Sequence, residues 1–410
     1  MLLLLTGALL GPAVRGQEAL RASLTGQMAL EAKKRRIAAG WGDIRLGPVQ
    51  VDLVGRMDVE ASDNVWYRDE STDEDLIFRP GLTVRALYPV SEKNLLSFGA
   101  GLAYNKYLQN SELDYFHVAP DSDLAFDLYV GDFLINLHNR VYYTAEVANE
   151  ASLSGVGRYG RFEDTVGALV VWDLNKLLLS FSADHQTYLA TDEVYDYMDH
   201  TSELFGLRSA WLLTPVTPLG VELGLGTTDY SKDLLDDMLH YSAGVFYEMP
   251  AGRFTSLRLG AGYVRYEPTT HSNTNLTSDE ALDGFYADLT FQHRITQTMT
   301  YQLSAGREVR AGVYSQTLEL IYARAWVTWN ILRGYGLTTS FGYEDGQESG
   351  SVYAWQLEEF SRFSTGLTIS KRLNEKLYTS LGYSFSQRES NVRRRDYAQN
   401  RLVLSVNYNF

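Results

Sequence analysis

From residue 49 to the end of the chain, apolar and polar side chains alternate within segments of about ten residues. In the first segment, Val49, Val51 and Leu53 share one face, while Gln50 and Asp52 share the other. A period of two places neighbouring side chains on opposite faces of a β-strand, so each segment is expected to be a strand with one apolar face. Further segments lie at 76–84, 96–104, 124–130 and 133–143, are centred near residues 169, 183, 208, 224, 243, 260, 288, 305, 325, 339, 366 and 382, and end with 401–410.

The last segment keeps this alternation to the final residue. Its apolar face consists of Leu402, Leu404, Val406, Tyr408 and Phe410. Chain ends usually fray, whereas a closed membrane barrel must pair its last strand with its first. The segment resembles the carboxy-terminal assembly signal of bacterial outer-membrane barrels, and this implies recognition by the barrel-assembly machinery. Taken alone, the segment is also compatible with an edge strand of a soluble sandwich.

The connectors between the segments alternate in length. Short ones lie at 131–132, 175–176, 215–218, 250–253, 296–298 and 374–375, and longer polar ones lie near 109–119, 148–160, 190–200, 230–237, 268–280, 345–354 and 389–396. Outer-membrane barrels have short periplasmic turns and longer external loops, and a soluble sandwich has no reason to alternate in this way. We therefore predict an all-β fold: a transmembrane antiparallel up-and-down β-barrel of about 18 strands, with short periplasmic turns, longer extracellular loops and both termini in the periplasm.

Aromatic side chains recur near the predicted strand ends. Trp172, Trp211 and Trp329 occupy apolar-face positions there. Tyr is favoured in strands generally, but Trp on the apolar face near strand ends is typical of the girdles at the two lipid interfaces of a membrane barrel. The aromatic positions therefore agree with a barrel that crosses the bacterial outer membrane.

The amino-terminal region differs from the rest. Leu2 to Val14 is an apolar run, and small residues near its end indicate a signal peptide over 1–16, although no Lys or Arg precedes the run. Residues 17–46 have a partly helical composition and a basic cluster at 33–36. We expect a periplasmic segment here, either a leader without fixed contacts or a region that touches an envelope partner. The barrel domain then covers 47–410.

Composition narrows the chemistry. The 410 residues include no Cys, so disulfides and thiolate metal sites are excluded, and the formal net charge of −15 argues against nucleic acid as a partner. The seven His residues show no metal-binding spacing, so neither a metal nor a cofactor is expected. After the amino-terminus, no apolar run reaches the roughly 18 residues that a membrane helix needs.

The polar face predicts the lumen. A barrel of this width is too wide for side chains to fill, so it leaves an aqueous channel or a plugged lumen. The inward side chains expected along the substrate path are Tyr129, Tyr142, Tyr188, Arg258, Tyr286, Arg294, Arg310, Tyr322, Arg324, Trp326, Arg362 and Tyr378. Aromatic rings suit a carbohydrate, and acidic residues on earlier strands facing arginines on later ones would create a transverse field. The other interpretation is that any wetted lumen needs polar residues.

Two short motifs suggest enzymes and are rejected. Gly155 to Gly160 match GxGxxG, but no helix pattern follows, so a glycine-rich external loop folded into the mouth is favoured over nucleotide binding. His240 and Ser242 resemble the His-x-Ser pair of outer-membrane phospholipases, whose dyad must face the lipid. Here both side chains fall on the inward face. We therefore predict a protein that is not an enzyme.

The chain from about residue 47 to 410 resembles the β-barrel porin 2 family of outer-membrane proteins. The resemblance rests on Arg56 to Val65, which looks like that family's first strand with its Asp-Asn-Val turn, and on the long final strands with a terminal Phe. Some members of the family accompany capsular or exopolysaccharide export systems, which implies polysaccharide export components as partners. Acidic external stretches such as 67–74 have two interpretations: a solvated surface, which is the commoner case, or carboxylates that bind lipopolysaccharide through divalent cations. The expected lipid partners are therefore outer-membrane lipid and lipopolysaccharide.

The resulting hypothesis is an outer-membrane channel that serves as the export pore for a capsular polysaccharide or exopolysaccharide. Three alternatives stay open: a general diffusion porin for small polar solutes, an outer-membrane lipid acylhydrolase, and a non-conducting structural barrel that anchors envelope partners.

Overall fold

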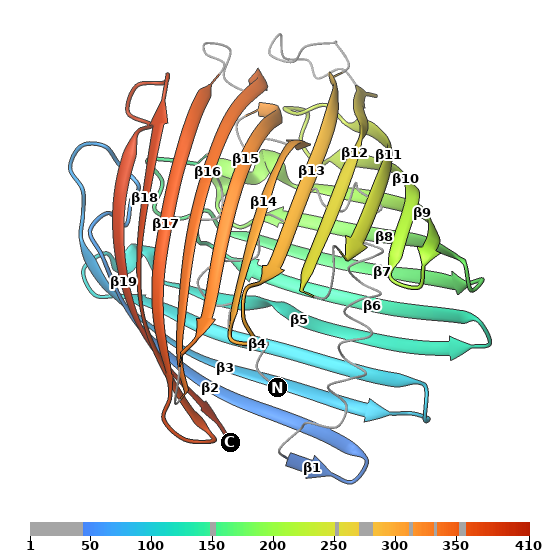
Figure 1. The fold of residues 1–410 in the computed structure, drawn as a ribbon. Coiled ribbons are helices and arrows are strands. Elements are labelled where there is room, and N and C mark those ends of the chain that lie inside the picture. Colours follow the sequence, from blue (N-terminus) through green and yellow to red (C-terminus); the bar gives the residue numbers. More distant parts are fainter. Residues whose placement is uncertain are drawn as a thin grey trace.

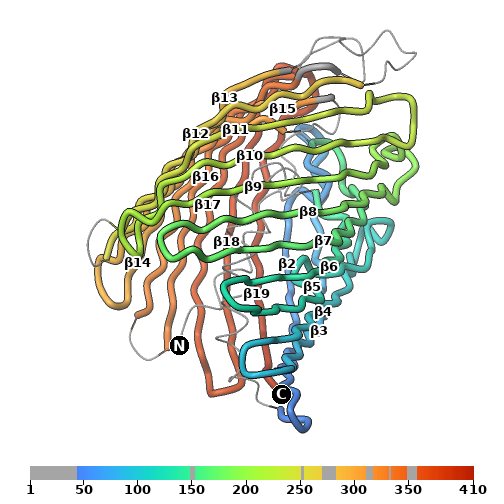
Figure 2. The backbone as a smooth tube through the Cα atoms, turned by 90° about the vertical axis from the view of Figure 1, so that its right-hand side faces the viewer, coloured from blue at the N-terminus to red at the C-terminus, as the bar shows by residue number. Residues whose placement is uncertain are grey.

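A computed structural model describes residues 44–147, 153–250, 254–269, 282–310, 315–331, 334–351 and 358–410. The predicted fold is confirmed: strands β2 to β19 form a closed antiparallel barrel of 18 strands. Each strand pairs with the next along the chain, and Figure 2 shows their continuous wall. In Figure 1 the later strands run steeply across the front while the early strands cross behind them, as the strand tilt of a closed barrel requires.

The strands are long. They span Val49–Ser62 (β2), Asp75–Pro89 (β3), Leu95–Tyr107 (β4), Tyr115–Val130 (β5), Phe133–Thr144 (β6), Arg161–Asp173 (β7), Leu177–Ala190 (β8), His200–Thr214 (β9), Thr217–Tyr230 (β10), Met238–Pro250 (β11), Thr255–Pro268 (β12), Leu282–Arg294 (β13), Met299–Arg310 (β14), Ser315–Asn330 (β15), Tyr335–Ser351 (β16), Glu359–Arg372 (β17), Leu377–Ser390 (β18) and Tyr397–Asn409 (β19). Two short 3₁₀ helices, Ser111–Leu113 (η2) and Glu193–Met198 (η3), lie in connectors.

The last strand closes the barrel. β19 pairs with β2, with Leu404 opposite Val59 and Val406 opposite Met57. The backbone N–H of Phe410 donates to the carbonyl of Leu53 at 3.0 Å. A ring of strands leaves no unpaired edge inside a lipid bilayer, where an unsatisfied backbone group is costly. The carboxy-terminal alternation is therefore the pattern of the closing strand.

The apolar face of each strand points outward. Leu404 is 47% exposed and Trp211 is 64% exposed, whereas Val403 beside Leu404 is buried. Trp172, Trp211 and Trp329 all lie outward near the short-connector ends of their strands, and Trp172 stacks on Phe133. Exposed apolar residues on this scale mark a lipid-facing surface, with the tryptophans at one interface.

Short and long connectors lie at opposite ends of the barrel, as predicted, apart from the brief β14–β15 connector at the long-connector end. The turn at 131–132 has Gly131 at φ 59°, a conformation that suits glycine. One boundary was wrong: the connector expected at 345–354 begins only after Ser351, because Asp345 and Gln347 still pair with Ile321 and Glu319 of β15. The outward residues of this extension are polar, so the alternation of apolar and polar residues ends before the hydrogen-bonded pairing of β15 with β16 does.

The predicted signal peptide and almost all of the segment 17–46 lie outside the described residues. Its last three residues, Ile44–Leu46 (β1), form a strand that pairs with β2 through a turn at Gly47, whose φ is 65°. The first strand that the structure describes thus lies slightly before the predicted start of the barrel at residue 47. Among the described residues there is no helix long and apolar enough to cross a membrane.

Candidate functional site: the lumen and its mouth

The inner face of the barrel carries the polar half of each strand's alternation. All twelve side chains expected along the substrate path occupy inward positions. Their neighbours along the chain show this most clearly, since Val130 beside Tyr129 and Ile321 beside Tyr322 are exposed on the outer face. That these twelve residues form a substrate path stays a prediction.

Burial divides these twelve residues. Tyr142, Tyr188 and Tyr286 are buried. Tyr286 is only 2% exposed, and its hydroxyl donates to Glu222 at 3.0 Å. Tyr188 bonds to Tyr159 of a connector. Covered rings cannot stack on a passing sugar. The partly accessible aromatic side chains of the set are Tyr129, Tyr322, Trp326 and Tyr378.

Glu344 joins two of the predicted arginines. It projects inward from β16 and contacts Arg324 of β15 at 2.7 Å and Arg362 of β17 at 2.5 Å. One carboxylate thus balances two guanidinium groups across three neighbouring strands, leaving one positive charge in excess. Because all three side chains are at most a quarter exposed, water screens the contacts only weakly.

A second ion-pair cluster lies where the barrel closes. Arg401 of β19 makes two hydrogen bonds to Glu60 of β2, at 2.8 and 2.9 Å, and Arg79 of β3 lies 3.5 Å from the same carboxylate. Glu146, just beyond β6, approaches Arg401 at 3.2 Å. Burial alone would raise the pKa of Glu146, but Arg401 and Arg79 outweigh burial and lower it to about 2. Glu146 is therefore an anion at neutral pH.

The third cluster surrounds Glu358. Its carboxylate accepts from Arg388 of β18 at 2.6 Å and from Arg395 of the β18–β19 connector. Arg388 is completely buried, and its guanidinium lies over the ring of Phe360 at 4.3 Å. It also donates to Ser154 at 3.3 Å. This arginine therefore ties β18 to the β6–β7 connector, which starts six strands away around the barrel.

The simple separation of an acidic wall from a basic wall was wrong. Asp58 on β2 pairs with Arg56 of the same strand at 2.7 Å, and Glu344 lies on β16 among the arginines of the later strands. Most charges thus find a partner on their own or a neighbouring strand. Local pairing weakens a transverse field, because a dipole of adjacent charges falls off faster than a separated one.

A tyrosine-rich cluster fills part of the mouth at the long-connector end. It contains Tyr67, Val147, Leu153, Tyr159, Tyr188, Tyr195, Tyr197, Met198, Leu235 and Tyr397. These residues come from four connectors and from the ends of β8 and β19. The rings of Tyr67 and Tyr397 meet edge to face with centroids 5.3 Å apart. Connectors that are buried in this way narrow the entrance of the barrel.

The β6–β7 connector reaches across the mouth. The N–H of Gly155 donates to the carbonyl of Tyr67 at 2.7 Å, while Ser154 meets Arg388. The glycines of the GxGxxG match are therefore loop residues, as predicted from the sequence. Gly155 has φ 69°, and a Cβ on Gly157 would lie 2.7 Å from the Trp66 ring. Both positions thus need glycine for a tight crossing.

His240 and Ser242 lie on the inner face, where the sequence placed them. Both are buried, and His240 Nε2 lies 3.2 Å from Thr228 Oγ1. An acyl chain in the membrane cannot reach this face, so the arrangement does not suit a lipid acylhydrolase. Within the described ranges, no three His, Cys, Asp or Glu side chains group as metal ligands.

The fold is shared with known outer-membrane channels. The chain is similar to the outer membrane protein OpdK of Pseudomonas aeruginosa, with 14% identity and a TM-score of 0.50 over 88% of this chain and 99% of that chain. It is also similar to OccK2 (OpdF) of Pseudomonas aeruginosa, solved with glucuronate, with 12% identity and a TM-score of 0.51 over 88% and 98% of the two chains. No family model and no curated protein matches the sequence. At this identity the similarity establishes the barrel fold.

Proposed function

We propose that the protein is a diffusion channel of the bacterial outer membrane for small polar solutes, with an entrance narrowed by inward-folded connectors. The observation that carries this proposal is the combination of a wide barrel, a charged inner wall and a mouth crossed by the β6–β7 connector. A wide barrel conducts unless something closes it. Partial closure restricts the size of the solute.

The polysaccharide export pore is the less favoured candidate. A long chain needs an unobstructed path and accessible rings, whereas three of the predicted tyrosines are buried and the mouth is crowded. The similar channel OccK2 was solved with glucuronate, a small polar molecule. For this protein we infer from that comparison only that the solute is small. The resemblance to the β-barrel porin 2 family, and export components as partners, stay proposals.

Liposome swelling tests the size limit. Proteoliposomes in monosaccharide, disaccharide and longer oligosaccharide solutions should swell at rates that fall steeply with solute size. Single-channel recordings in planar bilayers should show discrete conductance steps. Absence of both swelling and conductance would favour the non-conducting structural barrel, while passage of long oligosaccharides as readily as monosaccharides would favour export.

The orientation is also part of the proposal: short turns and both termini in the periplasm. The chain has no Cys, so a single introduced thiol reports its own side of the membrane. Ser231→Cys lies in an exposed long connector, and Asp132→Cys lies in an exposed short turn. In intact cells an impermeant maleimide should label the first variant and spare the second. Labelling of the second variant and not of the first would show that the barrel has the opposite orientation.

A further inference from the structure

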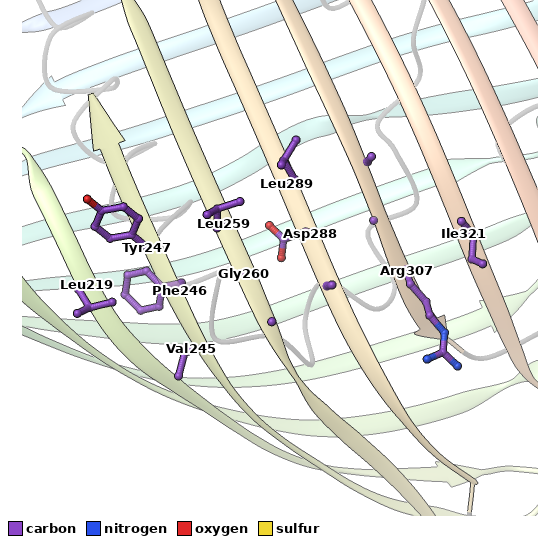
Figure 3. Close-up of a pocket in the computed structure, with 14 residues that line it drawn as sticks. Leu219, Val245, Phe246, Tyr247, Leu259, Gly260, Asp288, Leu289, Arg307 and Ile321 are labelled. Atoms are coloured by element: carbon purple, nitrogen blue, oxygen red, sulfur yellow. The ribbon is translucent and has the colours of Figure 1, made fainter. Parts of the chain in front are cut away.

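A shallow cavity of about 560 Å³ lies on the outer face of strands β10 to β15, within the lipid-facing surface (Figure 3). Its floor consists of small outward residues, among them Ala261, Ala287 and Ala305. Ala261 pairs directly with Ala287 across β12 and β13. Larger side chains such as Leu259 and Ile321 form its rims. The outer wall therefore has a furrow where a lipid chain can approach the backbone closely.

The furrow follows the hydrogen-bond ladder across the strands. Leu219 lies opposite Tyr247, Tyr247 opposite Leu259, and Leu259 opposite Leu289 on successive strands. Because barrel strands are tilted by about 40° from the axis, a line across them slopes through the membrane. The furrow accordingly leads from Tyr247, near the short-connector end of β11, toward Arg307, near the long-connector end of β14.

The end of the furrow near the long connectors is charged. Arg307 lines the furrow and makes two hydrogen bonds of 2.7 Å to Glu319 of β15, and the two side chains are 38% and 36% exposed. A charged pair on the outer wall is tolerated near the lipid interface and is costly at the bilayer centre. Arg307 and Glu319 therefore mark the level of the lipid headgroups.

Further charges continue this band on the outer wall. Arg265 of β12 lies 2.8 Å from Glu267, and the hydroxyl of Tyr263 donates to Asp283 of β13. These side chains are partly or fully exposed and lie beyond the apolar belt, toward the long-connector ends of their strands. Both signs are thus presented side by side: arginines that can bind phosphate, and carboxylates that can bind divalent cations through oxygen.

We propose that the furrow and this band form a binding site for lipopolysaccharide. One acyl chain lies in the alanine-floored furrow, a phosphate lies beside Arg307, and divalent cations join further phosphates to Glu319 and Asp283. Lipopolysaccharide carries phosphates that are bridged by divalent cations, so a protein that binds it can use arginines for the phosphates and carboxylates for the cations. A phospholipid with a single phosphate needs only the arginines. The assignment rests on the proposed orientation, because the furrow must rise toward the outer leaflet.

Native mass spectrometry of the barrel refolded in lipopolysaccharide-free detergent tests the site. Short-chain lipopolysaccharide is added with Mg²⁺, and phosphatidylethanolamine serves as the competitor lipid. Arg307→Gln removes the phosphate contact, and Ala287→Leu fills the furrow. Arg307→Gln should lower the retained lipopolysaccharide about tenfold, the effect of losing one charge-assisted contact. Ala287→Leu should also lower it, because the larger side chain excludes the acyl chain from the furrow. Ala183→Leu, on the outer face of β8, is the matched control and should bind as the wild type does.

Equal retention of phosphatidylethanolamine, or unchanged lipopolysaccharide binding in both furrow variants, would overturn the assignment. Folding is checked by heat-modifiable migration on gels, and Ala305→Leu fills the same furrow if Ala287→Leu does not fold. Conductance is recorded separately in bilayers without lipopolysaccharide. A conducting barrel that fails to bind therefore refutes the lipid site alone, and a binding barrel that fails to conduct refutes the channel alone.

Discussion

The substitution Glu344→Gln is the sharpest test of the charged inner wall. Glu344 is the shared partner of Arg324 and Arg362, at 2.7 and 2.5 Å, and all three side chains point into the lumen. The amide keeps the size of the carboxylate and removes its charge. Two arginines on β15 and β17 then face each other without an anion between them, and the inner wall gains one unit of positive charge.

Two magnitudes follow from this geometry. Breaking a buried ion pair by removing one partner costs about 3–5 kcal/mol, and the partial exposure of Arg324 and Arg362 places the expected loss near the lower value. One extra charge roughly 8 Å from a passing ion, in a lumen with the dielectric constant of water, changes the energy of that ion by about 0.5 kcal/mol. Chloride is stabilised and potassium destabilised by this amount, so the ratio of chloride to potassium permeability should rise about sixfold.

The assay is the reversal potential in a planar bilayer under a salt gradient, combined with urea unfolding in detergent. Asp345→Asn is a matched control: it removes the same charge from the adjacent residue of β16, whose side chain is exposed on the outer face. If both variants shift the reversal potential equally, or if neither does, the inner placement of Glu344 does not govern selectivity and the reasoning fails.

Three further predictions concern closure and the mouth. Phe410→Ser removes a ring that packs on Tyr408 at 5.0 Å and over Gly55, so folded barrel in the outer membrane should fall several-fold, measured by heat-modifiable migration. Glu146→Gln should reduce the free energy of unfolding by about 1 kcal/mol at pH 7. Because the pKa of Glu146 is lowered from 4.5 to about 2, this difference in stability is present above pH 4.5 and disappears as the pH falls through about 2. Gly157→Val would press on the Trp66 ring, 2.7 Å from the added Cβ, and the displaced connector should raise single-channel conductance.

Each of these has a distinct contrary result. Normal amounts of folded Phe410→Ser barrel would show that the terminal ring does not contribute to assembly. A stability difference for Glu146→Gln that persists unchanged at pH 2 would contradict the proposed ion pair with Arg401. Unaltered conductance in Gly157→Val would mean that the β6–β7 connector does not limit the flow of ions.

The sequence alone determined the barrel and the direction of its side chains. Alternation is a property of single strands, so the outward set from Leu402 to Phe410 and the inward positions of Arg324 and His240 could be read without any knowledge of partners. The number of strands and the segregation of short and long connectors followed from the same pattern. Where the wall extends beyond the lipid, as at 345–351, the apolar signal stops, and the strand end was misjudged.

Tertiary structure decided which inward groups meet. Glu344 acquires its two arginines from the register of three strands, and Glu60 meets Arg401 only because the first and last strands pair, across 341 positions of sequence. The structure of the mouth could not be predicted from the sequence either, because the β6–β7 connector has no periodicity and its path is set by contacts with Tyr67 and Arg388. A period of two specifies a face, whereas a contact requires register, closure and the folding of connectors over that face.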